Sequence, residues 1–238
     1  MSFFIPAIFV LLSAVISISL CKKYDVLLNY NGNKHQKYTS SKKIPMAGGV
    51  VSLLFVFVFI DFNLSINIFL FSIFVVGILS DLKLLESPTK RLFVQFLIII
   101  IFLYTLDIHL VSTRFKLLDF LLENNLFSFL FSTFCILIVI NGTNFIDGNN
   151  TNVLGYYLII SFIFLFLKDQ QFNTIDTNSN LLVIELISIL LIFNFFNKIY
   201  LGDSGAFLLG AAFGFMSIKL YLDNSEGISS FFIVLLLW

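Results

Sequence analysis

Long apolar runs alternate with short polar segments along the chain. Eight complete runs and a ninth that reaches the last residue are evident, at residues 3–20, 47–60, 66–79, 92–106, 126–140, 153–167, 181–196, 205–222 and 228–238. The runs are continuous and do not alternate apolar with polar positions, so they predict helices rather than barrel strands. Several hold only 14 to 16 strongly apolar residues. That is below the roughly 20 of a full span, so flanking Ser and Asn, tilt or burial must supply the rest. We predict an all-α, polytopic membrane helix bundle with about nine transmembrane helices.

The composition supports an integral membrane protein. The chain is 59% hydrophobic and 12% charged, with 32 Phe among its 238 residues, whereas soluble domains hold about 25% charged residues. No linker rich in Pro or Ser divides the sequence, and no repeat is visible. We therefore treat residues 1–238 as a single membrane domain.

The distribution of basic residues predicts the orientation of the helices. If the runs cross alternately, ten of the 14 Lys and Arg fall on one side, and four fall on the other, namely Arg114, Lys116, Lys168 and Lys219. Because cytoplasmic loops carry the excess of Lys and Arg, the richer side is predicted to be cytoplasmic. The N-terminus then lies outside.

Both ends of the chain leave alternatives open. The first run could be a signal peptide cleaved before Cys21, but no positive charge precedes it, so an uncleaved helix fits better. The chain stops at Trp238 within an apolar run. We expect that the end of a C-terminal helix and a following cytoplasmic loop are missing from it.

Four polar segments carry most of the candidate chemistry, at residues 42–49, 80–91, 141–148 and 202–205. Each lies at the end of an apolar run, and alternate crossing brings all four to the cytoplasmic face. Together they supply oxygen ligands, glycines and lysines. This combination indicates a site for phosphate and metal.

Two segments offer hard oxygen ligands. Asn141, Asn144 and Asp147 recur every three residues and share one stripe if the helix continues; alternatively, they end the helix. Asp203 precedes a helix start, where free N–H groups favour anions, and it either caps that helix or binds a metal. Oxygen donors without a Cys or His cluster favour Mg²⁺, with Mn²⁺ as the alternative, over zinc.

The other two segments are less specific. Asp81 closes the third run and begins a charged loop that is either functional or a solvated membrane anchor. Lys43 precedes Pro45 and a pair of glycines, and it could contact phosphate or anchor the membrane face. Residues 108–120 mix β-branched and charged residues, and we expect a short hairpin there.

Taken together, the four segments resemble the polyprenyl-phosphate N-acetylhexosamine-1-phosphate transferases, glycosyltransferase family 4. The matching motifs are Ile44-Pro45-Met46-Ala47-Gly48-Gly49, Gly77-x-x-Ser80-Asp81 with Ser87-Pro88 and Arg91-Leu92-x-x-Gln95, Asn141-x-x-Asn144-Phe145-x-Asp147-Gly148, and Tyr200-Leu201-Gly202-Asp203-Ser204-Gly205. Their order and spacing agree with the family over the whole chain. The Ser-Pro and Arg-Leu-x-x-Gln pattern is closer to the branch that starts O-antigen synthesis on lipopolysaccharide than to the peptidoglycan branch.

The resemblance implies an activity and its partners. The family passes a sugar 1-phosphate from a UDP-N-acetylhexosamine, such as UDP-N-acetylglucosamine, to undecaprenyl phosphate and releases UMP, which starts a lipid-linked cell-envelope glycan. It implies an enzyme of the bacterial inner membrane with its active site on the cytoplasmic face. No nucleic acid takes part, and a homodimer is left open.

The resemblance also assigns roles to residues. It implies that Asp203 and Asn144 bind Mg²⁺ and that Asp81, Asp147 and Asn144 are catalytic, with Asp81 near the lipid phosphate. The residues implied to bind substrate are Lys43, Asn141, Gly148, Asn149, Asn150 and Tyr200.

The sequence departs from the family at three places. Ser80 stands where members usually carry a first Asp, and Asn149-Asn150-Thr151 replaces a Leu, an acid or amide, and Gly. A late cytoplasmic loop rich in His and Arg is absent. A catalytically impaired, nucleotide-sugar-binding remnant is therefore one alternative function. A membrane transporter is the other, but transporters place charges near the bilayer midplane, whereas these carboxylates gather at one interface.

Overall fold

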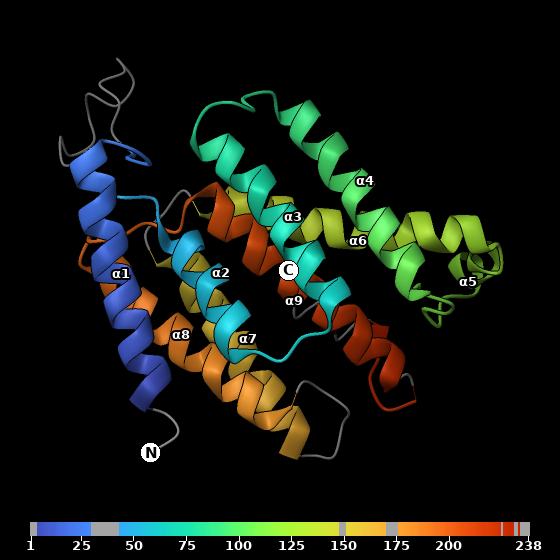
Figure 1. Ribbon diagram of the computed structural model, residues 1–238. Coiled ribbons are helices and arrows are strands. Elements are labelled where there is room, and N and C mark those ends of the chain that lie inside the picture. The colour runs from blue at the N-terminus through green and yellow to red at the C-terminus, as the bar shows by residue number, and fades with distance from the viewer. Residues whose placement is uncertain are drawn as a thin grey trace.

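The computed structural model describes residues 4–29, 43–147, 151–169, 176–224, 226–230 and 233 (Figure 1). These residues form nine α-helices and one isolated bridge, between Leu28 and Pro45. The helices are α1 Phe4–Tyr24, α2 Gly48–Phe59, α3 Leu64–Asp81, α4 Pro88–Leu106, α5 Lys116–Leu122, α6 Asn125–Ile146, α7 Asn152–Asp169, α8 Thr177–Phe195 and α9 Gly202–Asp223. The all-α prediction is confirmed for the described residues.

Eight of the predicted apolar runs are helices. Six described helices (α1, α3, α4, α6, α8 and α9) are long and apolar enough to cross a membrane by length and composition, and the shorter α2 and α7 are apolar as well. The ninth run lies largely outside the described residues. Large apolar side chains on α1, such as Phe4, Leu12 and Ile16, are exposed, as suits contact with lipid.

The hairpin expected at residues 108–120 is wrong. Residues 108–115, all described, form no strand, and Arg114 has a left-handed φ of +65°. Asp119, in the first turn of α5, folds back to accept hydrogen bonds from Thr113 N at 2.5 Å and from the Ser112 hydroxyl at 2.9 Å. Side-chain bonds of this kind compete with strand pairing, so the segment closes on the short helix instead.

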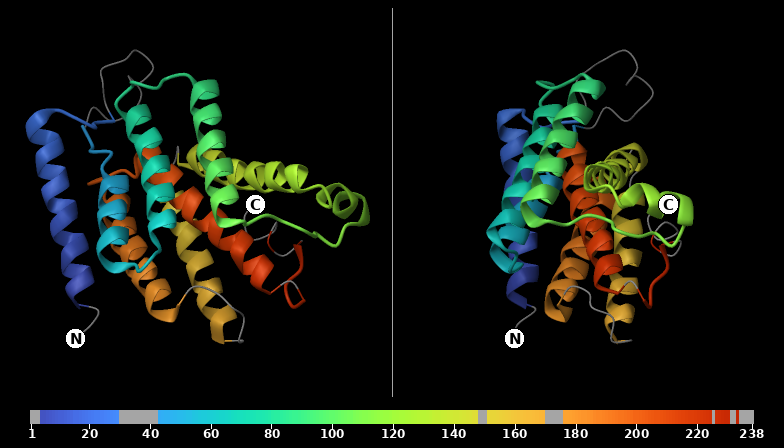
Figure 2. Two further views of the ribbon diagram at one scale, coloured as in Figure 1. Left: turned by 45° about the vertical axis from the view of Figure 1, so that its right-hand side comes forward. Right: turned by 90° about the vertical axis from the view of Figure 1, so that its right-hand side faces the viewer.

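Helix α9 is the central element of the molecule. It packs against α2, α3, α6 and α7 (Figure 1), and 83% of its most apolar stretch is buried. Helix α6 runs across the direction of α3 and α4 in both figures and meets α9 (Figures 1 and 2). The N-terminal end of α9 lies against other helices, and three of the predicted site residues, Asp81, Asp147 and Asp203, lie there.

Glycines allow α9 to approach α2 and α3 closely. A Cβ atom added at Gly77 would lie 2.3 Å from Ser204 Cα, and one added at Gly49 would lie 2.4 Å from Gly205 N. Both distances are shorter than any real contact, so side chains at these two positions would push α9 away. Helix contact through small residues is common in membrane proteins, and here it brings the end of α3 against the start of α9.

Candidate active site at the start of α9

The segment before α2 holds the loop that leads into α9. Gly48 N and Gly49 N donate to Tyr200 O and Leu201 O at 2.9 and 3.0 Å, and Tyr200 N donates to Pro45 O at 2.7 Å. Because Gly48 and Gly49 are the first residues of α2, their N–H groups have no partner within that helix. The 44–49 motif therefore positions the 200–205 motif through backbone hydrogen bonds.

Asp81, the last residue of α3, caps α9. Its two carboxylate oxygens accept hydrogen bonds from Asp203 N at 2.8 Å and from Ser204 N at 3.0 Å. The preceding Gly202 has φ +75°, and a Cβ there would lie 2.9 Å from Asp81 Oδ2. Our expectation that free N–H groups at this helix start would bind a substrate anion is therefore wrong for these two groups, because the Asp81 carboxylate occupies them.

Asp203 lies in the first turn of α9 and is paired with Arg91 from the first turn of α4. Arg91 Nη1 donates to Asp203 Oδ2 at 2.6 Å and to Ser80 Oγ at 2.6 Å, and the Ser80 hydroxyl donates to Asp203 Oδ2 at 2.5 Å. The Arg91 and Asp203 side chains are 19% and 31% exposed. The serine that replaces a family carboxylate thus belongs to a three-residue network around Asp203.

Helix α6 ends beside these groups and contributes Asn141, Asn144 and Asp147. Asn141 donates to Gln95 Oε1 at 2.9 Å and to Leu137 O at 2.8 Å, so its amide faces α4. Asn144 is one turn further on and partly exposed. Burial, together with the charges of Asp203 and Asp81, raises the pKa of the Asp147 carboxyl to about 8. Three carboxylates from three helices therefore share one electrostatic environment.

The residues expected to bind nucleotide are described only in part. Gly148, Asn149 and Asn150 lie outside the described residues. The next residue, Thr151, donates its N–H to Asn194 Oδ1 at 2.7 Å, and Asn194 Nδ2 donates to Ile199 O at 3.1 Å. Asn194 thus joins the start of α7 to the loop that carries Tyr200, whose hydroxyl donates to Asn197 Oδ1 at 3.1 Å.

Lys43 is engaged at the edge of the molecule. Its ammonium group pairs with Asp25 Oδ1 at 2.6 Å, and both side chains are more than half exposed. The backbone of this segment reaches the site through Pro45, but no described contact joins the Lys43 side chain to Asp203, Asp147 or Asn144.

Sequence reasoning missed three residues as members of the site. Arg91 and Gln95 lie within a motif that by itself assigns them no role, and Asn194 lies within an apolar run. Gln95 is fully buried and Asn194 is 4% exposed. A polar residue inside an apolar helix is costly unless it is bonded, and this is the signal that could have identified Gln95 and Asn194.

The residues at this site fit a magnesium ion in their chemistry. Asp203, Asp147 and Asn144 offer hard oxygen donors, and burial, followed by the negative charges of Asp203 and Asp81, raises the pKa of Asp147. No cluster of three or more His, Cys, Asp or Glu suited to a metal occurs among the described residues. That does not conflict with Mg²⁺, which proteins usually hold through one or two carboxylates, waters and substrate phosphates.

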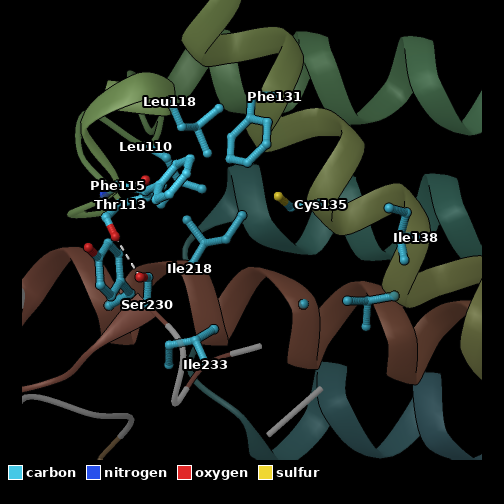
Figure 3. A pocket seen from close by; sticks show the side chains of 13 residues that line it. Leu110, Thr113, Phe115, Leu118, Phe131, Cys135, Ile138, Ile218, Ser230 and Ile233 are labelled. Atoms are coloured by element: carbon cyan, nitrogen blue, oxygen red, sulfur yellow. Dashed lines mark hydrogen bonds between the residues drawn. The ribbon is translucent and has the colours of Figure 1, made fainter. Parts of the chain in front are cut away.

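A separate cavity lies toward the other end of α9 (Figure 3). Its volume is about 390 Å³, and apolar side chains from α5, α6 and α9 line it, among them Leu118, Phe131 and Ile218. Ser230 closes one side by donating to Thr113 O at 2.5 Å. None of the predicted site residues lines this cavity.

Comparison with known proteins supports the resemblance. Glycosyl transferase family 4 matches residues 63–221. The chain is 30% identical to a phospho-N-acetylmuramoyl-pentapeptide-transferase of Dictyoglomus thermophilum over 185 residues, which is 73% of this chain and 58% of that protein. It is 26% identical to the protein of the same name from Dictyoglomus turgidum, over 73% of this chain and 59% of that one. The chain thus spans less than three-fifths of the length of these relatives. The family match covers most of the chain and includes Asp81, Arg91, Asp147 and Asp203, and the chain belongs to Glycosyl transferase family 4.

Proposed function

We propose that this protein transfers an N-acetylhexosamine 1-phosphate from a UDP-sugar to undecaprenyl phosphate at the cytoplasmic face of the bacterial inner membrane. A lipid phosphate oxygen attacks the sugar-side phosphorus of the UDP-sugar, the bond from that phosphorus to the bridging oxygen breaks, and UMP leaves. The observation that carries the proposal is the meeting of Asp81, Asp147 and Asp203 at the start of α9 in a chain of this family.

The reaction brings two polyanions together, so their repulsion must be offset. Asp203 and Asn144 are the residues we assign to Mg²⁺, with Mn²⁺ as the alternative. An ion held by these residues would offset the charge of the pyrophosphate. Arg91, which pairs with Asp203 in this structure, supplies a further positive charge that can offset the substrate phosphates.

We assign two tasks to Asp81. It fixes the start of α9 by accepting the N–H groups of Asp203 and Ser204, and it lies near the place proposed for the lipid phosphate. Asp147 has a carboxyl pKa of about 8, so this group can hold a proton at neutral pH and exchange it with a phosphate. Tyr200, Asn141 and the 148–150 segment are the residues we assign to the nucleotide.

Two UDP-sugars are candidates for the sugar-phosphate donor. The Ser87-Pro88 and Arg91-Leu92-x-x-Gln95 motifs favour UDP-N-acetylglucosamine and the O-antigen branch. The names of the two curated relatives favour a UDP-N-acetylmuramoyl-pentapeptide donor and peptidoglycan synthesis. Asn149 and Asn150, which depart from the family pattern, lie in the segment assigned to the nucleotide.

A donor panel tests the proposal. The purified protein is incubated in nanodiscs with undecaprenyl phosphate, Mg²⁺ and each UDP-sugar, and UMP release is measured together with label in the lipid fraction. We expect equal amounts of UMP and lipid-linked sugar phosphate with one donor. Binding of a UDP-sugar without either product would favour the nucleotide-sugar-binding remnant. In a separate preparation of sealed vesicles, uptake of solute into the lumen would favour the transporter.

A further inference from the structure

Arg91 occupies a position that a cation bound to the Oδ2 atom of Asp203 would need. Its Nη1 atom lies 2.6 Å from Asp203 Oδ2, and the Ser80 hydroxyl reaches the same oxygen at 2.5 Å. A divalent ion would approach that oxygen to roughly 2.1 Å. Two positive groups at one carboxylate oxygen repel each other strongly in a half-buried site.

Among the described residues, Arg91 is the cation that pairs with a carboxylate of this site, namely that of Asp203. Asp81 is offset by backbone N–H groups and the α9 dipole instead. In this chain residue 80 is a serine, so it cannot hold the guanidinium with a charge of its own, and Arg91 pairs with Asp203.

We propose that Arg91 is a positioning residue that holds Asp203 in the substrate-free protein and competes with the divalent cation for its carboxylate. The inference rests on the proposed function, because that function supplies the cation. When the cation binds, Arg91 leaves Asp203 and its guanidinium is released toward the substrate phosphates. Planar guanidinium groups suit such oxygens, since they can donate two parallel hydrogen bonds.

The first test measures Mn²⁺ affinity without substrate, by the electron paramagnetic resonance signal of free Mn²⁺ over the purified full chain. We expect Arg91→Gln to bind Mn²⁺ about tenfold more tightly than wild type, since one neighbouring charge commonly changes a carboxylate equilibrium by that factor or more. The gain should vanish in Arg91→Gln combined with Asp203→Asn. Lys90→Gln removes the adjacent exposed cation and should stay within about twofold of wild type, as a surface charge does.

The second test uses the wild-type protein and does not depend on a variant that folds. The chain has two arginines, Arg91 and Arg114, and Arg114 is exposed at the far end of α4, just before α5. Phenylglyoxal, which modifies arginine, is applied with and without Mn²⁺, and both sites are quantified by mass spectrometry. We expect Mn²⁺ to speed modification of Arg91 at least about threefold, because the guanidinium leaves its ion pair, and to leave Arg114 unchanged.

The outcomes separate this inference from the proposed function. Mn²⁺ that binds wild type but binds Arg91→Gln equally or more weakly, or that slows Arg91 modification, would overturn the inference and leave the cation site standing. Failure of Mn²⁺ to bind any variant would overturn both the cation assignment and the inference.

Discussion

At the residue scale, the three carboxylates at the start of α9 differ in what offsets their charge. Asp81 accepts two backbone N–H groups, and Asp203 pairs with Arg91 and Ser80. Within the described residues, no hydrogen bond or ion pair to a side chain offsets the Asp147 carboxylate, which faces the charges of the other two. Asp147 thus lies partly buried beside two other carboxylates without a hydrogen-bonding partner of its own among the described residues, and the pKa of its carboxyl is raised.

This raised pKa predicts how stability depends on pH. The pKa of Asp147 is raised from 3.8 to about 8, so the folded protein keeps a proton that the unfolded chain has lost. The stabilising contribution is complete below the unfolded value and is lost as pH rises through about 8. Asp147→Asn stays neutral throughout. In EDTA, the thermal midpoint of this variant minus that of wild type should therefore increase from pH 5 to pH 9.

Thermal unfolding at pH 5, 7 and 9 checks this. Asp61→Asn, which removes an exposed carboxylate after α2, is the control and should follow wild type. A constant difference between Asp147→Asn and wild type over the whole range would contradict the raised pKa.

The sequence indicates candidate residues of the site, but it does not indicate which of them contact one another. Motif spacing made Asp81, Asp147 and Asp203 site candidates, because Asp81 and Asp203 flank apolar runs and Asp147 follows Asn141 and Asn144 at three-residue spacing. It could not show that Asp81 binds the backbone of α9 or that Arg91 pairs with Asp203, since residues 81 and 203 meet only after α3 and α9 have packed. The roles of Asn144 as a metal ligand and of Lys43 as a phosphate contact stay predictions.

At the scale of elements, the packing of α9 depends on residues that have no side chain. The apolar runs predicted eight of the described helices, because continuous hydrophobicity is a local signal. The inclination of α6 and the short helix α5 depend on tertiary contacts and on the Asp119 bonds, so hydropathy alone could not indicate them. Gly49 and Gly77 lie in sequence motifs, and in the structure they allow α2 and α3 to approach α9 closely.

This packing makes a prediction for two glycines. Gly77→Ala places a Cβ 2.3 Å from the Ser204 backbone, so α9 must shift, at a cost of about 1–3 kcal/mol. The matched control is Gly142→Ala on α6, where a Cβ meets nothing within 4 Å. It should leave stability unchanged or raise it by up to about 1 kcal/mol through helix propensity. Unfolding in detergent measures both, and equal stability of the two variants would contradict the close contact of α3 with α9.

At the scale of the whole molecule, the predicted orientation places the start of α9 on the cytoplasmic side. Lys83 lies in the loop before α4, Lys116 begins α5 after it, and both are exposed. In a chain with Cys21→Ala and Cys135→Ala, we expect an impermeant maleimide to label Lys116→Cys in intact cells and Lys83→Cys only after lysis. The physical reason is the excess of Lys and Arg on the cytoplasmic side. Labelling of Lys83→Cys alone in intact cells would reverse the orientation.

We propose the start of α9 as the active site of a sugar-phosphate transferase, and Asp203→Asn removes the charge on which that assignment depends. This change keeps the backbone N–H that Asp81 binds and removes the charge. With the donor that wild type uses, we expect UMP release to fall at least about 100-fold, as when a key electrostatic group is removed, while Asp61→Asn retains the wild-type rate. Wild-type turnover by correctly folded Asp203→Asn would contradict the claim.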